Sequence, residues 1–282
     1  MTESPVLIKN SLPTMNRSEI FLVMVSGMGT IAGSVMGTYI GMLGGTDPAA
    51  KVLFATHLLS ASVMAVPGSI VLAKMLCPQT EEATDHVAIS GKEKENSNIL
   101  DAISSGTVTG VKLMTNIAAM LLVFISLVAL ANYITEGVIG RYTGLNDWIV
   151  KITDGKAQGL TFQFILGVIT SPFMWLIGVP SQDIMLVGSL LGQKTILNEF
   201  VAYFQLQQWK DAGLFMYEKS ILMSTYILCG FANISSIGIL LGGLGVLAPE
   251  KRGLISRIGV PAMIGGALVS VLSATIIGMI LG

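Results

Sequence analysis

Long apolar runs constrain this sequence more than any other feature. A helix needs about 20 apolar residues to cross the hydrocarbon core of a bilayer. Only 12% of the 282 residues are charged, whereas a soluble domain carries about 25%. The runs predict an all-α, multi-pass integral membrane protein, because a transmembrane β-barrel shows alternating segments of about ten residues instead. They lie at about residues 19–45, 49–76, 116–135, 158–179, 217–248 and 258–281.

The distribution of charge predicts an orientation. If the loops at 1–18, 74–115 and 249–257 share one side, that side holds nine Lys and Arg residues against six on the other. Cytoplasmic loops carry such an excess, so we expect these loops in the cytoplasm. The net charge of −1 gives no reason to expect nucleic acid as a partner. The two cysteines lack metal-ligand spacing, so no metal site of that kind is expected.

The middle of the chain predicts elements outside the two apolar halves. Residues 77–100 are polar with both signs of charge, which is typical of a solvated loop. Residues 99–115 mix apolar and small polar residues, which favours a short interfacial helix before the connecting span at 116–135. Residues 136–157, with Tyr142 and Trp148 among charges, are expected at the opposite interface.

A re-entrant hairpin is predicted after residue 182. The apolar stretches 183–192 and 196–206 are each about half a span long, and Gly192-Gln193-Lys194-Thr195 separates them. Irregular backbone at membrane depth persists only where protein or a water-filled cavity satisfies it. Glu199 lies in this hairpin, and an ionisable residue there indicates function, although it is also compatible with a helix end at the surface. For Lys194, snorkelling to the interface is the alternative to a functional role.

An internal repeat explains polar residues inside an apolar run. Residues 27–35, GMGTIAGSV, align with residues 230–238, GFANISSIG, at an offset of 203 residues. Each segment interrupts a broken helix, and a long straight helix follows each. The single full span between the copies predicts that the second copy is inverted. Inverted repeats in transporters place such interruptions near the midplane, where they bind substrate and ion. Packing of helices through small and polar residues is the competing interpretation.

The predicted domains follow the repeat. Residues 1–76 form the first repeat of a transport domain, with a partial hairpin, a broken helix and a straight helix. Residues 77–157 supply the loop, the interfacial helix and the scaffold span. Residues 158–282 form the second repeat.

Five motifs resemble those of the concentrative nucleoside transporters, in particular their NupC-like bacterial members, and the likeness runs from residue 2 to residue 282. The motifs are GQKTILNEFVAY, CGFANISSIGI, GGLGVLAPEKR, NRSEIFLVMVSG and GTIAGSV. The resemblance implies import of a nucleoside, coupled to Na+ or H+, by alternating access in a homotrimer of the cell membrane. It implies no enzyme activity and no cofactor besides the coupling ion.

The resemblance also implies the site residues. Thr2 and Glu3 would contact the nucleobase, and Val35 and Phe231 would be apolar pocket residues. The ribose would be bound by Glu199, Asn233 and Ser236, and the cation by the Thr30 hydroxyl and the Ile31 carbonyl.

The chain departs from the family at its start. Met1 stands where the family has the Gln of a Gln-Thr-Glu motif, and the family's preceding helices, about the N-terminal third, are absent. A truncated, non-transporting fragment is therefore the alternative to an active importer. An enzyme has little support, because no catalytic triad order, metal-ligand cluster or phosphate loop is found.

Overall fold

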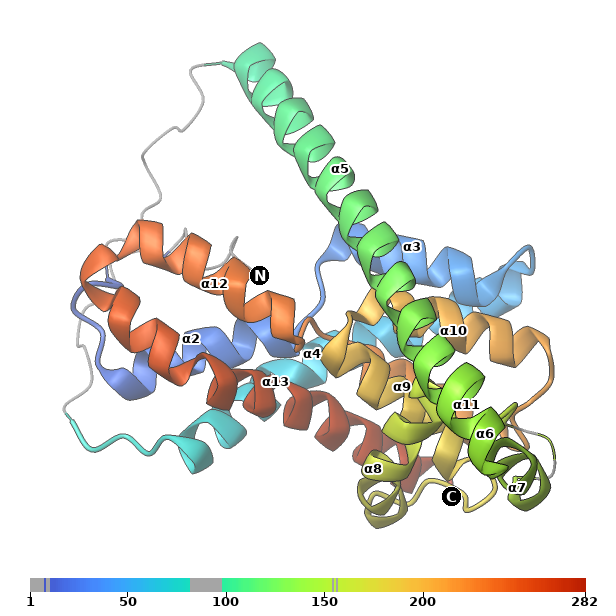
Figure 1. Cartoon of the computed structure of the whole chain (residues 1–282). Helices are drawn as coiled ribbons and strands as arrows, with labels where there is room; N and C mark the ends of the chain where they lie inside the picture. The colour runs from blue at the N-terminus through green and yellow to red at the C-terminus, as the bar shows by residue number, and fades with distance from the viewer. Residues whose placement is uncertain (1–7, 9–10, 82–97, 154, 156) are drawn as a thin grey trace. The chain divides into compact units, whose positions relative to one another are not determined.

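The computed structural model describes residues 8, 11–81, 98–153, 155 and 157–282, and throughout these residues the regular structure is helical. It divides into two compact units, residues 1–89 with 165–282, and residues 90–164 (Figure 1). The first unit contains α2 (Arg17–Gly29), α3 (Gly33–Gly44), α4 (Pro48–Leu76), most of α8 (Phe162–Leu176), α9 (Ile184–Ile196), α10 (Glu199–Asp211), α11 (Glu218–Leu228), α12 (Ile234–Leu247), a 3-10 turn (Pro249–Lys251) and α13 (Arg252–Ile280). The second contains α5 (Ile99–Asn132), a π-helical segment (Tyr133–Gly140), α6 (Arg141–Thr143) and α7 (Leu145–Ile152).

The first broken helix begins and ends where local chemistry requires it. Asn16 accepts a hydrogen bond from the Glu19 amide, and the Glu19 carboxylate accepts one from the Asn16 amide, which forms a capping box for α2. The backbone is extended at Thr30 and Ala32, and α3 then follows. Asp47 caps α4, whose first residue is Pro48, a position where the missing amide is harmless.

The second repeat follows the same order. Helix α11 ends at Leu228, α12 begins at Ile234, and the straight helix α13 follows after a short turn. At the offset of 203, α4 maps onto residues 251–279, and α13 spans Arg252–Ile280. Helices α4 and α13 pack against each other (Figure 1).

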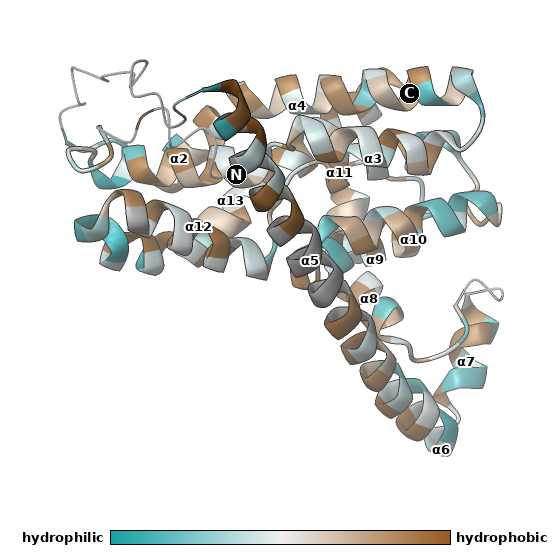
Figure 2. Ribbon diagram, turned by 90° about the horizontal axis from the view of Figure 1, so that it is seen from above, coloured by the Kyte–Doolittle hydropathy of each residue, from teal (hydrophilic) through white to brown (hydrophobic). Residues whose placement is uncertain are grey.

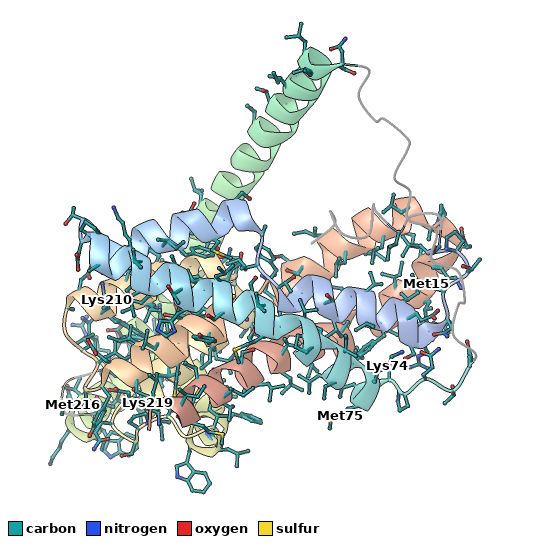
Figure 3. The ribbon with its side chains drawn as sticks, turned by 180° about the vertical axis from the view of Figure 1, so that it is seen from behind. Met15, Lys74, Met75, Lys210, Met216 and Lys219 are labelled. Atoms are coloured by element: carbon teal, nitrogen blue, oxygen red, sulfur yellow. The ribbon has the colours of Figure 1, made fainter. Side chains whose placement is uncertain are left out.

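The second repeat is inverted with respect to the first. Helix α2 begins, and α4 ends, at the end of the unit where the Lys74 ammonium donates to the Ser18 hydroxyl. Helix α11 begins, and α13 ends, where the Lys219 ammonium donates to the Gly282 carbonyl. Figure 3 shows Lys74 and Met15 at one end of the unit and Lys210 and Lys219 at the other. Helix α4 is therefore antiparallel to α13.

Described residues from each of the three loops that the charge distribution groups together lie at one end of the first unit. The Lys251 ammonium donates to the Met15 carbonyl over 2.8 Å, and Lys74 lies at the same end. Hydrophilic residues gather at the junction of α12 with α13 and at the end of α10 (Figure 2). The cytoplasmic location of the three loops stays a prediction.

Within the described part of the chain, three helical stretches are long and apolar enough to cross a membrane, namely Arg17–Gly44, Pro48–Leu76 and Pro249–Ile280. The predicted run at 158–179 instead contains a helix of only 15 residues, α8, which is followed by Gly178 at φ +83° and Pro180. Left-handed backbone and a proline explain why this helix stops short of a full span.

The hairpin turn lies later than the sequence predicts. Residues 192–195 are helical, and α9 continues to Ile196, so the predicted turn there is wrong. The backbone breaks at Leu197 and Asn198, because the Asn198 side chain accepts from the Val201 amide and caps α10.

The second unit is built around one long helix. The predicted interfacial segment 99–115 and the span 116–135 are joined in the single helix α5, of 34 residues, so no break in the backbone separates them. The side-chain oxygen Oδ1 of Asn132 accepts from the Phe162 amide, and that of Asn146 accepts from the Leu160 amide. These two bonds hold the segment before α8 against the end of α5 and against α7. Tyr142 and Trp148 are exposed on this unit.

The two interruptions meet inside the first unit. A Cβ atom at Gly230 would lie 2.8 Å from the Gly29 carbonyl oxygen, and one at Gly266 would lie 2.7 Å from the Met28 Cβ atom. Gly230 also has φ +117°, a conformation that side chains strongly disfavour. Glycine is therefore required where the backbone of one repeat touches that of the other.

Replacing Gly230 tests this close approach. We expect Gly230→Ala to destabilise the protein by about 2 kcal/mol or more, because strained backbone alone costs about 1–3 kcal/mol. The measurement is the apparent melting temperature of the purified protein in detergent. Gly238→Ala is the matched control, since its Cβ atom meets nothing within 4 Å. Equal melting temperatures for the two variants would contradict the prediction.

Candidate functional site

Glu199 lies where the hairpin meets both repeats. It is the first residue of α10, and its side chain is only 8% exposed. Its Oε2 accepts a hydrogen bond from the Asn233 amide Nδ2 over 3.0 Å, and its Oε1 accepts one from the Tyr39 hydroxyl over 3.4 Å. Tyr39 belongs to α3 and Asn233 to the second interruption. The carboxylate therefore joins three elements far apart in sequence.

Asn233 serves two partners at once. Its Oδ1 accepts from the Ser236 amide over 2.9 Å and caps α12, and it also accepts from the Ser235 hydroxyl. Because Oδ1 is used in this way, the amide nitrogen is directed at Glu199. The polar residues inside this apolar run thus satisfy the start of α12 and hold the carboxylate.

Ser236 and Phe231 shape the same interruption. The buried Ser236 hydroxyl donates to the Phe231 carbonyl, which lies in the extended segment between α11 and α12. The Phe231 side chain is partly buried and packs against the core cluster that also contains Ile31 and contacts Val35. The segment between α11 and α12 therefore supplies polar groups, and both repeats supply the apolar side chains around it.

Aromatic residues around Glu199 are absent from the sequence prediction. The Tyr39 ring stacks on the Tyr203 ring at a centroid distance of 4.1 Å. The centroid of the Phe200 ring lies 6.2 Å from that of Tyr39. Tyr203 follows Glu199 by four residues, so helical spacing indicates that both lie on one face of α10. No local signal indicates Tyr39, which is 160 residues from Glu199.

The end of α11 shows how an interruption persists in an apolar interior. The last carbonyls of a helix have no partner within it. Here the Tyr203 hydroxyl donates to the Thr225 carbonyl over 2.8 Å, and the Lys194 ammonium donates to the Ile227 carbonyl over 2.8 Å. The Ser270 hydroxyl, from α13, donates to the Cys229 carbonyl. Side chains thus replace the missing helical hydrogen bonds.

The remaining predicted residues occupy the first interruption or lie outside the described residues. The Thr30 hydroxyl donates to the Ser26 carbonyl over 2.9 Å, and Ile31 is 8% exposed. Both interruptions converge, because Gly230 touches Gly29, next to Thr30. Thr2 and Glu3 lie outside the described residues.

Comparison with known proteins places this geometry in a family. The family described as Na+ dependent nucleoside transporter C-terminus matches residues 57–278. A nucleoside permease of Helicobacter pylori, NupC, is 37% identical over 100% of this chain and 62% of its own length. An uncharacterized transporter of Haemophilus influenzae is 38% identical over 100% of the chain and 63% of its length. Sodium/nucleoside cotransporter 1 of Rattus norvegicus is 38% identical over 99% of the chain and 42% of its length.

Solved structures match the fold as well. The transporter CNTnw in an inward-facing, substrate-bound state has a TM-score of 0.83 and 36% identity over 100% of this chain and 62% of its own. A variant of it in an outward-facing state has a TM-score of 0.84 and 35% identity over 99% of this chain and 62% of its own.

The chain belongs to the concentrative nucleoside transporter family. This confirms the predicted family, the all-α repeat fold and the multi-pass membrane location. The relatives with named activities are transporters, which agrees with the prediction that this family member is not an enzyme. The chain spans 62% to 63% of the length of its bacterial relatives.

The double role of Asn233 is testable through stability. We expect Asn233→Ala to lower the melting temperature more than Asn16→Ala does. Both variants remove a helix cap worth about 0.5–2 kcal/mol, but only the first also takes a donor from a buried carboxylate, which adds about 1–3 kcal/mol. Asn16 caps α2 through the same contact, because its side chain also accepts from the amide three residues later. Equal losses, measured on purified proteins in one detergent, would show that the contact with Glu199 contributes nothing.

Proposed function

We propose that this family member takes part in the import of nucleosides across the cell membrane, driven by a cation gradient through alternating access. The hydrogen-bonded pair of Glu199 and Asn233, buried where the hairpin meets both repeats, carries the proposal. Relatives named as nucleoside permeases and cotransporters support it, and so do related structures in inward-facing and outward-facing states.

The ribose is the part of the substrate that this pair suits. A carboxylate accepts hydrogen bonds from sugar hydroxyls, and an amide both donates and accepts. We assign the hydroxyl contacts to Glu199, Asn233 and Ser236, with Val35 and Phe231 as apolar neighbours. In the proposed complex, an analogue without hydroxyls leaves buried polar groups unpaired and binds weakly.

The nucleobase contacts are assigned to Thr2 and Glu3, as the family resemblance implies. The coupling cation is assigned to the first interruption, at the Thr30 hydroxyl and the Ile31 carbonyl. Hard oxygen ligands of this kind suit Na+, and H+ is the alternative coupling ion. A homotrimer is the proposed assembly.

Replacing the carboxylate tests the ribose assignment. In cells without their own nucleoside importers, we expect Glu199→Gln in the full-length protein to raise the KM for uridine about tenfold or more. A hydrogen bond to a charged group contributes about 1.5–3 kcal/mol, which corresponds to about ten- to a hundredfold. Glu218→Gln, an exposed position at the start of α11, is the control and should transport normally.

The same cells provide a sharper measurement with 2′,3′-dideoxyuridine, which lacks the 2′ and 3′ hydroxyls of the ribose. Its inhibition of uridine uptake, compared with that by unlabelled uridine, measures what these hydroxyls contribute to binding. Wild-type uptake should be inhibited far more by uridine than by the dideoxy analogue, and Glu199→Gln should narrow that difference. An unchanged ratio of the two inhibition constants would rule out Glu199 as a ribose ligand. No uptake by a well-expressed wild-type protein would count against nucleoside import itself.

The cation assignment has its own test. Thr30→Val keeps the shape of the side chain and removes the hydroxyl, so the half-saturating cation concentration for uptake should rise about fivefold, the equivalent of one hydrogen bond of about 1 kcal/mol. Uptake is measured over a series of Na+ concentrations and of external pH, which identifies the coupling ion. Thr56→Val is the control, because the Thr56 hydroxyl donates to a carbonyl four residues earlier, as that of Thr30 does. An identical response in both variants would contradict the assignment.

A further inference from the structure

Lys194 is fully buried although it carries an ammonium group. It lies in α9, and its relative exposure is 0%. Its Nζ donates to the Ile227 carbonyl over 2.8 Å and to the Ser270 hydroxyl over 3.0 Å. Among the described residues, the only ion pair within 4.0 Å joins Lys210 to Asp211. None of the described carboxylates therefore lies within ion-pair distance of the Lys194 ammonium. Uncharged oxygens therefore hold a buried positive charge.

These oxygens belong to the end of an interrupted helix. Ile227 lies in the last turn of α11. The Ser270 hydroxyl, which accepts from Lys194, donates in turn to the Cys229 carbonyl in the interruption itself. The C-terminus of a helix carries a partial negative charge and unpaired carbonyls, which attract cations. In transporters, half-helix ends of this kind and unwound carbonyls coordinate the coupling ions. The Lys194 ammonium lies where an ion would be expected.

We propose that the Lys194 ammonium is a tethered cation, which occupies the carbonyl end of α11 in place of an exchangeable cation. The inference rests on the proposed function, which assigns an exchangeable cation to the first interruption. The ammonium fixes the last turn of α11 and hence the segment that leads to Asn233. Lys194 is a positioning residue for Asn233 and Glu199, and exchangeable cation binding is confined to the first interruption.

Removing the tether should create a second ion site. In Lys194→Ala, the Ile227 and Cys229 carbonyls lose their cation and the side chain leaves space for a free one. A ligand that binds only the folded state raises its melting temperature as its concentration increases. We therefore expect the melting temperature of purified Lys194→Ala to rise more steeply with Na+ or methylammonium than that of the wild type, at constant ionic strength balanced with choline.

Lys210→Ala is the matched control. The Lys210 ammonium also donates to a carbonyl in the last turn of a helix, that of Leu43 in α3, over 2.7 Å, but it lies at the outer end of the unit and is partly exposed. Its replacement should leave the cation response at the wild-type slope. A Lys194→Ala protein whose slope also equals that of the wild type would overturn the proposal.

Transport gives an independent readout. Lys194→Ala should raise the nucleoside KM about tenfold, as expected for loss of a charged hydrogen bond that holds the site, and methylammonium should partly restore it. A folded variant with the wild-type KM would overturn the positioning role. If the wild type imports no nucleoside, the proposed function fails, but the melting experiment still decides whether Lys194 occupies an ion site.

If Lys194→Ala does not accumulate in the membrane, two further variants decide the matter. Lys194→Met keeps the length of the side chain without its charge, and wild-type stability and KM in this variant would overturn the proposal. Ser270→Ala removes one ligand of the ammonium and the donor to Cys229. It should raise the nucleoside KM with Vmax little changed, and an unchanged KM would also overturn the proposal.

Discussion

Unpaired backbone groups at interrupted helices are the constraint on which the rest of this structure depends. An apolar surrounding offers no water to the carbonyls at the end of α11 or to the amides at the start of α10 and α12. The side chains of Asn198 and Asn233 supply acceptors to the amides, and those of Tyr203, Lys194 and Ser270 supply donors to the carbonyls. Their presence inside apolar runs is therefore a requirement of the fold before it is a feature of any binding site.

The candidate site arises from the same groups. Asn233 uses its oxygen to cap α12 and its nitrogen to hold Glu199, so the polar group that permits the interruption also orients the carboxylate. Tyr203 stacks on Tyr39 while its hydroxyl pairs with the end of α11. Because each side chain has both roles, the geometry of the site is determined by the geometry of the helix ends.

The sequence predicts the helices better than their partners. The apolar run and the repeat at an offset of 203 predict a helix at residues 251–279, and α13 spans Arg252–Ile280. Both signals can be seen in the sequence, because one is local and the other is periodic. The hairpin turn is wrong because Gly192 to Thr195 have the composition of a turn, whereas burial of that segment and the cap at Asn198 decide where the helix ends. The contacts of Tyr39 with Glu199 and of Lys194 with Ser270 join residues 160 and 76 positions apart, and no local pattern encodes them. The roles of Thr30, Ile31, Val35, Phe231 and Ser236 in binding stay predictions.

The close approach of the two interruptions bears on coupling in the proposed mechanism. Gly230 lies against the Gly29 carbonyl, so the backbone beside Thr30 and the backbone that leads to Asn233 are in direct contact. Coupling between two ligands requires that each favours the same arrangement of the protein. A cation that orders the segment at Thr30 therefore acts on Gly230 without a long chain of intermediates, because neither glycine has a side chain to absorb the displacement. The tethered cation at Lys194 holds the last turn of α11, from which the same segment starts. The start of the second interruption is therefore fixed by Lys194, while Gly230 contacts the backbone that the ion orders.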